Sequence, residues 1–119
     1  MAIGVITEYL WLPGVSSRKG EIIMWVRLTF AKIQPDKMDE FRKIYNGQIV
    51  PTVKAQKGNV DIFCLESVDE DGEWISFTSW DSKEYGDTYE ASGTYKEMVG
   101  KVAHTFAEPP TLKSYEVKK

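Results

Sequence analysis

The stretch that decides the fold is NVDIFCLESVDEDGEWISFTSW, residues 59–80. Its two halves, residues 59–68 and 73–80, are rich in β-branched and aromatic side chains, which favour strands. Between them lies an acidic segment that ends in Asp-Gly, a dipeptide typical of tight hairpin turns. Successive side chains of a strand point to opposite faces. One face of the second half therefore carries Trp74, Ser76, Thr78 and Trp80, and the other carries Ile75 and Phe77. The stretch predicts an antiparallel hairpin.

The residues before the hairpin predict a strand and then a helix. Residues 22–33, IIMWVRLTFAKI, show the alternation of a strand. One face of this strand carries Val26, Leu28 and Phe30, and the other carries Trp25, Arg27, Thr29 and Ala31. Pro35 favours a first helical position, and Asp36 suits the same helix end. The buried stripe of the helix, at helical spacing, is Met38, Phe41, Tyr45 and Ile49. We expect a kink or restart at Pro51 and a left-handed C-terminal cap at Gly58.

The residues after the hairpin predict two helices and a last strand. Asp81 and Glu84 have the spacing of a capping box, which begins a short helix that carries Tyr85 and Tyr89. A second helix is expected over residues 94–106. Its apolar stripe is Tyr95, Met98, Val99, Val102 and Phe106. Pro109 and Pro110 end it, and TLKSYEV, residues 111–117, is the last strand.

The order strand, helix, strand, strand, helix, strand is that of the ferredoxin-like split βαβ layout. The expected fold class is α+β, with a four-stranded antiparallel sheet and helices on one face. The other sheet face would be bare, and we expect it to show Trp25, Trp74 and Trp80. Because a large apolar face marks an interaction surface, the sequence predicts a twofold homodimer through this open sheet face.

Composition excludes several function classes. The 119 residues suit one domain, which we place at residues 22–119, with residues 1–21 as an N-terminal extension. A net charge of −3 without a basic run argues against nucleic acid and against an anionic membrane surface. A single cysteine, Cys64, precludes an intrachain disulfide, and no segment approaches the roughly 20 apolar residues that span a bilayer. We therefore expect a cytoplasmic protein.

Most candidate chemical groups have a simpler structural interpretation. Cys64 lies mid-strand and is interpreted as buried and inert, and His104 as a surface residue. One histidine and one cysteine without ligand spacing do not make a metal site. Arg27 has two interpretations: an interface arginine paired with an acid of a partner chain, or a clamp for an anionic or phenolate ligand. The cluster Trp80, Tyr89 and Tyr95 is either plain core or the wall of an aromatic pocket with polar tips.

Four stretches together resemble a known family: VRLTFAKIQPDKMDEFRKIY, IVPTVKAQKGNVDIFCLES, WISFTSWDSKEYGDTYEASGTYKEM and FAEPPTLKSYEV. They are similar to the antibiotic biosynthesis monooxygenase domain of the dimeric α+β barrel superfamily, over residues 24–117. The strongest pieces are Pro51 followed by Gly58, and Trp80 at the step from a strand into a helix. The resemblance implies the topology above, a homodimer, and a ligand pocket in each protomer between sheet and helices.

The resemblance also implies an activity. Some members oxidise quinol- or anthrone-like aromatics with O₂ and no cofactor. Others degrade haem and bind its iron through a histidine, where this chain has Val99, so we expect no cofactor and no metal. The function predicted is a cofactor-independent monooxygenase for a small aromatic substrate. Tyr89 and Tyr95 would be catalytic, and Trp80, Arg27 and Tyr85 would bind substrate. Two alternatives are a binding protein without turnover and a structural dimer whose interior is filled by side chains.

Overall fold

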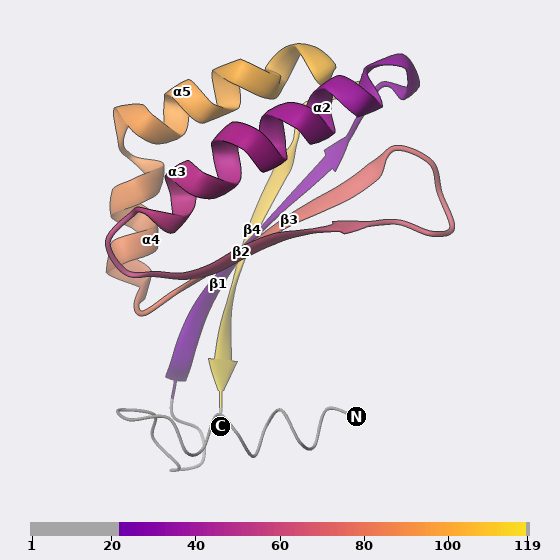
Figure 1. The fold of residues 1–119 in the computed structure, drawn as a ribbon. Helices are drawn as coiled ribbons and strands as arrows, with labels where there is room; N and C mark the ends of the chain where they lie inside the picture. Colours follow the sequence, from indigo (N-terminus) through magenta and orange to yellow (C-terminus); the bar gives the residue numbers. More distant parts are fainter. Residues whose placement is uncertain (1–21, 119) are drawn as a thin grey trace.

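The computed structural model describes residues 22–118, which form one four-stranded sheet covered on one side by helices (Figure 1). The strands are β1 (Ile22–Lys32), β2 (Asn59–Glu66), β3 (Glu73–Trp80) and β4 (Thr111–Lys118). Their order in the sheet is β2-β3-β1-β4, and every neighbouring pair is antiparallel. This is the predicted ferredoxin-like topology. The predicted extension, residues 1–21, lies outside the described residues.

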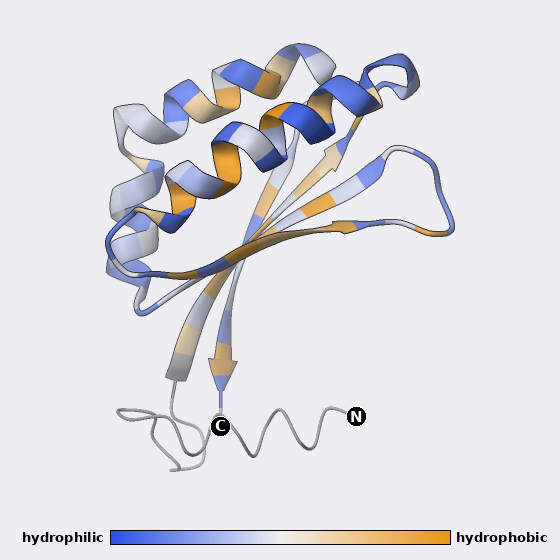
Figure 2. Cartoon of the chain, in the orientation of Figure 1, coloured by the Kyte–Doolittle hydropathy of each residue, from blue (hydrophilic) through white to orange (hydrophobic). Residues whose placement is uncertain are grey.

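The helices lie in one layer across the sheet (Figure 1). The first helical segment comprises a 3₁₀ turn, η1 (Pro35–Lys37), then α2 (Met38–Ile44), a π-helical turn, η2 (Tyr45–Ile49), and α3 (Val50–Lys54). The second comprises α4 (Lys83–Glu90), α5 (Gly93–Val102) and a 3₁₀ turn, η3 (Ala103–Thr105). Figure 2 shows that apolar residues of α2 and α3 turn toward the sheet, as the helical spacing predicts. Within residues 22–118, no helix has both the length and the apolar character needed to cross a bilayer.

The predicted antiparallel hairpin of β2 and β3 is confirmed. Strands β2 and β3 are antiparallel neighbours, with Phe63 opposite Phe77. The two rings stack with centroids 4.4 Å apart. Gly72 has φ +83°, a conformation that glycine adopts without strain, and its carbonyl accepts a hydrogen bond from the Ile33 N–H at 2.7 Å. The turn is thereby fixed to the end of β1.

Pro51 changes the first helix in a defined way. Directly before it, the Val50 N–H donates to the Tyr45 carbonyl, five residues back, so the chain makes a π-helical turn. A proline has no N–H to donate, and its ring excludes the carbonyl four residues earlier, which disfavours a regular α-turn there. The turn buries both Tyr45 and Ile49. The restart predicted at Pro51 is therefore observed.

Two predicted caps differ from the structure. Gly58 has the expected positive φ of +83°, but α3 already ends at Lys54, so Gly58 belongs to the turn that leads into β2. The N-cap of α4 is Ser82 rather than Asp81, and it makes no side-chain capping bond. The capping box was therefore wrong. A true side-chain cap occurs one helix later, where the Ser92 hydroxyl accepts from the Tyr95 N–H at 3.2 Å.

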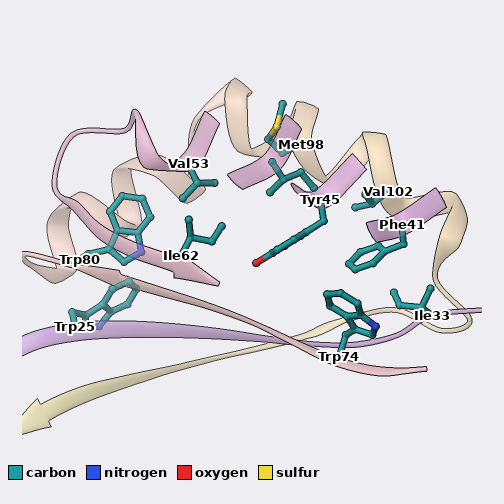
Figure 3. Close-up of a cluster of buried hydrophobic side chains, with 11 residues drawn as sticks. Trp25, Ile33, Phe41, Tyr45, Val53, Ile62, Trp74, Trp80, Met98 and Val102 are labelled. Atoms are coloured by element: carbon teal, nitrogen blue, oxygen red, sulfur yellow. The ribbon is translucent and has the colours of Figure 1, made fainter. Parts of the chain in front are cut away.

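The assignment of the two sheet faces was wrong. Trp25, Trp74 and Trp80 are 4%, 3% and 1% exposed and lie beneath the helices, not on the open face. Figure 3 shows Trp25 and Trp80 at one end of the buried cluster and Trp74 at the other. The open face carries the alternate residues instead. Four of them have exposures of 38–46%: Phe63, Leu65, Tyr115 and Val117.

The physical reason is that alternation alone does not say which face the helices cover. Both faces of the central strands carry large apolar side chains, so both satisfy the pattern of a buried face. The indole rings extend farther from the sheet than leucine or phenylalanine. They fill the space between the sheet and the helices, where all three indoles are buried. The prediction that one apolar face is left open nevertheless holds.

One close approach sets the distance between α4 and the sheet. Gly86 is buried, and a β-carbon added to it would lie 2.1 Å from Trp25 Cζ3. Gly86→Ala should therefore lower the free energy of unfolding by about 1–3 kcal/mol, the usual cost of overpacking a core. Urea unfolding followed by circular dichroism measures the change.

The matched control for Gly86→Ala is Gly100→Ala, at an exposed position in the last turn of α5. A β-carbon at Gly100 meets nothing within 4 Å. Both substitutions gain helix propensity, by up to about 1 kcal/mol, so only the contact with Trp25 distinguishes them. Equal unfolding free energies for the two variants would contradict this account of the α4 packing.

Candidate functional site

A cavity of about 110 Å³ lies between the sheet and the helices. Alternate residues of β1 and β3 form its floor, and all four α-helical segments contribute to its walls. A ligand pocket was predicted in this position. Because the interior keeps this space, the structure does not support the alternative in which side chains fill it completely.

One end of the cavity is aromatic and apolar. Phe41 packs edge-on against Trp74, with centroids 4.7 Å apart and an interplanar angle of 76°. Tyr45 lies between the two ends of the cluster in Figure 3, with its hydroxyl pointing toward the sheet. That hydroxyl is 2.7 Å from Ser76 Oγ. Burial raises the pKa of Tyr45 to about 12, against the opposing effect of the Ser76 hydrogen bond. Tyr45 is thus a neutral, fixed polar group in an apolar wall.

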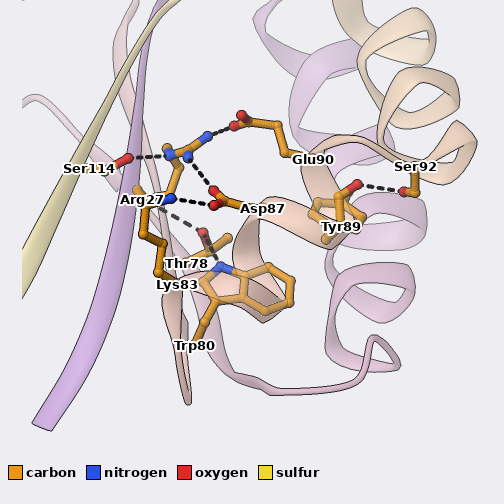
Figure 4. Close-up of polar contacts among 9 residues, drawn as sticks. All are labelled: Arg27, Thr78, Trp80, Lys83, Asp87, Tyr89, Glu90, Ser92 and Ser114. Carbon is orange, nitrogen blue, oxygen red and sulfur yellow. Dashed lines mark hydrogen bonds and ion pairs between the residues drawn. The ribbon is translucent and has the colours of Figure 1, made fainter.

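The other end of the cavity is charged. Arg27 projects from β1 on the helix-covered face, and its side chain is only 14% exposed. Its Nη1 contacts the Glu90 carboxylate, its Nη2 lies 3.8 Å from Asp87 Oδ1, and its Nε donates to Ser114 Oγ at 2.7 Å (Figure 4). Its guanidinium also lies 4.8 Å from the ring centroid of Trp25. Arg27 therefore joins β1, β4 and α4 at one point.

The acidic partners of Arg27 belong to its own chain. Because Arg27 lies on the covered face, the interpretation as an arginine of the open-face interface does not describe its position. Burial lowers the pKa of Arg27, while the nearby Asp87 opposes that effect. An arginine remains charged under such conditions, so the cavity contains a permanent cation beside a carboxylate. This position agrees with the interpretation as a clamp for an anion.

Tyr89 and Tyr95 are brought together at the charged end. Their rings meet edge-on with centroids 5.5 Å apart, and both line the cavity. Burial, with the nearby Tyr95, raises the pKa of Tyr89 to about 12. Burial also raises the pKa of Tyr95, while Arg27 lowers it by a smaller amount. Both phenols are therefore neutral at physiological pH, and they can donate a hydrogen bond but cannot serve as a base.

Two other residues predicted to bind substrate lie elsewhere. Trp80 does not line the cavity; its ring stacks on Tyr89 from behind, with centroids 5.4 Å apart, and its Nε1 donates to Thr78 Oγ1 at 3.0 Å. Tyr85 lies outside the cavity as well. Its ring packs against the backbone of Gly58, where a β-carbon would lie 2.2 Å from Tyr85 Cγ. Trp80 thus supports the position of Tyr89, and Tyr85 supports the turn before β2.

Glu90 is the site residue that the sequence analysis missed. It is the last residue of α4 and follows Tyr89 directly, and both residues line the cavity. A glutamate at a helix end is usually solvated, and nothing in its immediate sequence distinguishes it. The available signal was indirect: Glu90 lies four residues after the buried Gly86, on the same face of α4.

The remaining candidates lie away from the cavity. His104 is exposed, as predicted, and its Nε2 lies 2.5 Å from Glu40 Oε2. Cys64 is partly buried in β2, and burial raises the pKa of its thiol. The described part of the chain holds no group of three or more His, Cys, Asp or Glu side chains with the geometry of a metal site.

Comparison with known proteins now gives these features a context. The family model described as antibiotic biosynthesis monooxygenase matches residues 24–101. A solved protein of Nitrosomonas europaea, whose name provisionally assigns it to antibiotic biosynthesis monooxygenases, superposes with a TM-score of 0.73 at 18% identity. The match covers 82% of this chain and 92% of that one. No curated protein matches the sequence.

Two further solved structures share the fold. A Caulobacter crescentus protein with the same provisional name gives a TM-score of 0.72 at 18% identity, over 85% of this chain and 92% of that one. A Bacteroides thetaiotaomicron protein of unknown function, named a possible oxidoreductase, gives a TM-score of 0.69 at 12% identity. The match covers 82% of this chain and 100% of that one. At these identities the structures establish the fold alone.

Alkaline pH should weaken the fold through the tyrosines of this site. The pKa of Tyr89 is about 12 in the folded protein, whereas in an unfolded chain it is 10.0. The stability from this difference is complete below pH 10 and is lost as the pH rises toward 12. The melting temperature should therefore fall over this range, and less steeply for Tyr89→Phe. If the melting temperature of Tyr89→Phe fell as steeply with pH as that of the wild-type protein, the raised pKa of Tyr89 would be contradicted.

Proposed function

Because the chain belongs to the antibiotic biosynthesis monooxygenase family, we propose that it oxidises a single-ring phenol or hydroquinone with O₂ and without a cofactor. The observation that carries this proposal is the form of the cavity: mostly apolar walls with a few polar groups, of which the charged pair Arg27 and Glu90 lies at one end. Such a cavity suits a flat aromatic ring with its hydroxyl at the polar end. The family supports the reaction class, and the cavity supports the substrate class.

The size of the cavity favours one ring over three. Its volume of about 110 Å³ is below the range of roughly 300–1,000 Å³ typical of drug-sized ligands. It is closer to an engineered cavity of about 150 Å³ that binds benzene in another protein. An anthrone has three fused rings and would require the walls to move apart. A hydroquinone is therefore the better candidate of the two substrate types predicted from the sequence.

The reaction balances without an external reductant. A hydroquinone and O₂ yield a hydroxyquinone and water, so one oxygen atom enters the ring and the other becomes water. All four electrons come from the substrate. The protein then needs only to bind the ring, promote loss of the phenolic proton, and stabilise the electron-rich anion that reacts with O₂.

The proposed roles follow from position. Arg27 stabilises the phenolate, since it is a buried cation at the polar end of the cavity. Tyr89 and Tyr95 donate hydrogen bonds and orient the ring, because their raised pKa values keep them protonated. Trp80 holds Tyr89 in place by stacking.

Oxygen consumption tests the proposal. The purified protein, with a chelator present and no cofactor added, should consume O₂ with single-ring hydroquinones faster than their autoxidation, and should leave anthrones at their autoxidation rate. Uptake with anthrones alone would contradict the substrate size. No uptake with any substrate, from folded protein, would contradict the oxygenase and leave a binding protein without turnover.

Paired variants locate this activity in the cavity. Tyr89→Phe should reduce turnover about tenfold or more, since a hydrogen bond to a charged group contributes about 1.5–3 kcal/mol. Tyr85→Phe removes a hydroxyl from the same helix but outside the cavity, and should retain turnover. Equal turnover of both variants would remove Tyr89 from the site.

We also propose that a second copy of the chain covers the open sheet face. The exposed residues on this face, with the stacked pair Phe63 and Phe77, form an apolar surface of the kind that marks an interface. A twofold axis through such a surface makes the same patch contact itself. The resemblance to a superfamily of dimeric barrels supports the same occupant.

Sedimentation equilibrium tests the dimer. Phe63→Lys places a charge on the open face and should convert a dimer into a folded monomer, because Phe63 is 42% exposed and lies outside the buried core. Val68→Lys is the matched control, since Val68 is 96% exposed in the turn between β2 and β3. A wild-type monomer, or dissociation by both variants, would contradict the proposed interface.

A further inference from the structure

We propose that Glu90 takes the proton of the bound phenol while Arg27 moves from the Glu90 carboxylate to the phenolate oxygen. This inference rests on the proposed function, because it assigns the proton acceptor of the same cavity. The O–H bond of the substrate breaks and an O–H bond forms on Glu90, so no electron is gained or lost in this step.

Glu90 has the necessary position. Its carboxylate lines the cavity and contacts Arg27 Nη1, and its side chain is 34% exposed (Figure 4). It follows Tyr89 at the end of α4, so the acceptor, the hydrogen-bond donor and the cation lie together at the polar end. A hydroxyl that enters this end meets both members of the ion pair.

The other polar groups of the lining cannot accept this proton. Tyr89 and Tyr95 are neutral phenols, and Thr29, Ser76 and Thr78 are neutral hydroxyls. Among the described residues that line the cavity, Glu90 is the one carboxylate. The histidine that would be the usual candidate for a base, His104, contacts Glu40 outside the cavity.

The net charge of the cavity also favours transfer of the proton to Glu90. Before the transfer, the cavity holds Arg27 as a cation and Glu90 as an anion. After the transfer it holds Arg27 and a phenolate, with Glu90 neutral, so the net charge is unchanged. An uncompensated charge beneath the helices is unfavourable, and an exchange of partners avoids it. Deprotonation by solvent would also leave a phenolate, but with Glu90 still charged beside it.

The surroundings support the exchange. Arg27 keeps a second carboxylate neighbour in Asp87, which is 2.5 Å from Lys83 Nζ on its other side. Tyr95 from α5 and Ser114 from β4 complete the polar groups that face Arg27.

Counting the protons released when a phenol binds tests the proposal without any reaction with O₂. The probe is para-nitrophenol, a single-ring phenol whose visible absorbance rises when it ionises. It is bound to the purified full chain at a pH where the free ligand is neutral. Absorbance then reports the ionisation state of the bound ligand, and calorimetry in buffers of different ionisation enthalpy counts the protons released.

The wild-type protein should bind the ligand as phenolate and release no proton, because Glu90 retains it. Glu90→Gln should release one proton for each phenolate bound, and its affinity should rise about tenfold per pH unit up to the pKa of the free ligand. Asp87→Asn also removes an acidic neighbour of Arg27, but Asp87 does not line the cavity. Like the wild-type protein, this variant should bind the ligand as phenolate and release no proton.

Five results would overturn the proposal. They are release of a proton by the wild-type protein, binding of the ligand as neutral phenol, binding of phenolate by Glu90→Gln without proton release, release of a proton by Asp87→Asn, and absence of binding. In the wild-type protein, the absorbance and the proton count together test whether the protein retains the proton, and the comparison of Glu90→Gln with Asp87→Asn tests whether Glu90 holds it. Because the readouts are the ionisation of the ligand and the release of protons, the result stands whether or not hydroquinones are consumed.

Discussion

The structure is organised around a charged side chain on the covered face of its central strand. Arg27 lies beneath the helices with 14% of its side chain exposed, and a buried guanidinium requires carboxylates and hydrogen-bond acceptors around it. Glu90 and Asp87 from α4 and Ser114 from β4 supply them. The position of α4 is therefore tied to the sheet through electrostatics, and not only through apolar packing. The same requirement keeps one end of the interior polar, next to an aromatic core.

Apolar packing fixes the position of α4 more closely than its ion pairs with Arg27 could do alone. Gly86 lets α4 approach the ring of Trp25, and Trp80 stacks on Tyr89 from the side away from the cavity. An ion pair tolerates small shifts of its partners, whereas contacts between rings and backbone do not. The tyrosine and the glutamate at the end of α4 are thus held against the cavity by the contact of Gly86 with Trp25 and by Trp80, which does not line the cavity. This is why a residue predicted to bind substrate, Trp80, has a supporting position instead.

The topology could be predicted from the sequence because each element has its own local signal. The Asp-Gly turn, the alternation in residues 22–33 and the helical spacing around Phe41 each specify one element, and their order specifies the fold. The covered face could not be predicted, since large apolar residues occupy both faces of β1 and β3. Of the residues predicted for the candidate site, Arg27, Tyr89 and Tyr95 line the cavity, while their roles stay a prediction. Glu90 was missed because its role depends on the distance between α4 and β1, which no local pattern contains.

A cavity of this kind needs little catalytic equipment if the substrate is its own reductant. O₂ reacts with an electron-rich anion, so the protein must control one proton and keep the resulting charge away from water. A histidine is the usual means, and here His104 lies outside the cavity. An ion pair between Arg27 and Glu90 offers another means, because its two members separate the tasks. The cation stabilises the product of deprotonation, and the carboxylate holds the proton. The raised pKa values of Tyr89 and Tyr95 fit this division, since neutral phenols beside the pair can orient a substrate without competing for its proton.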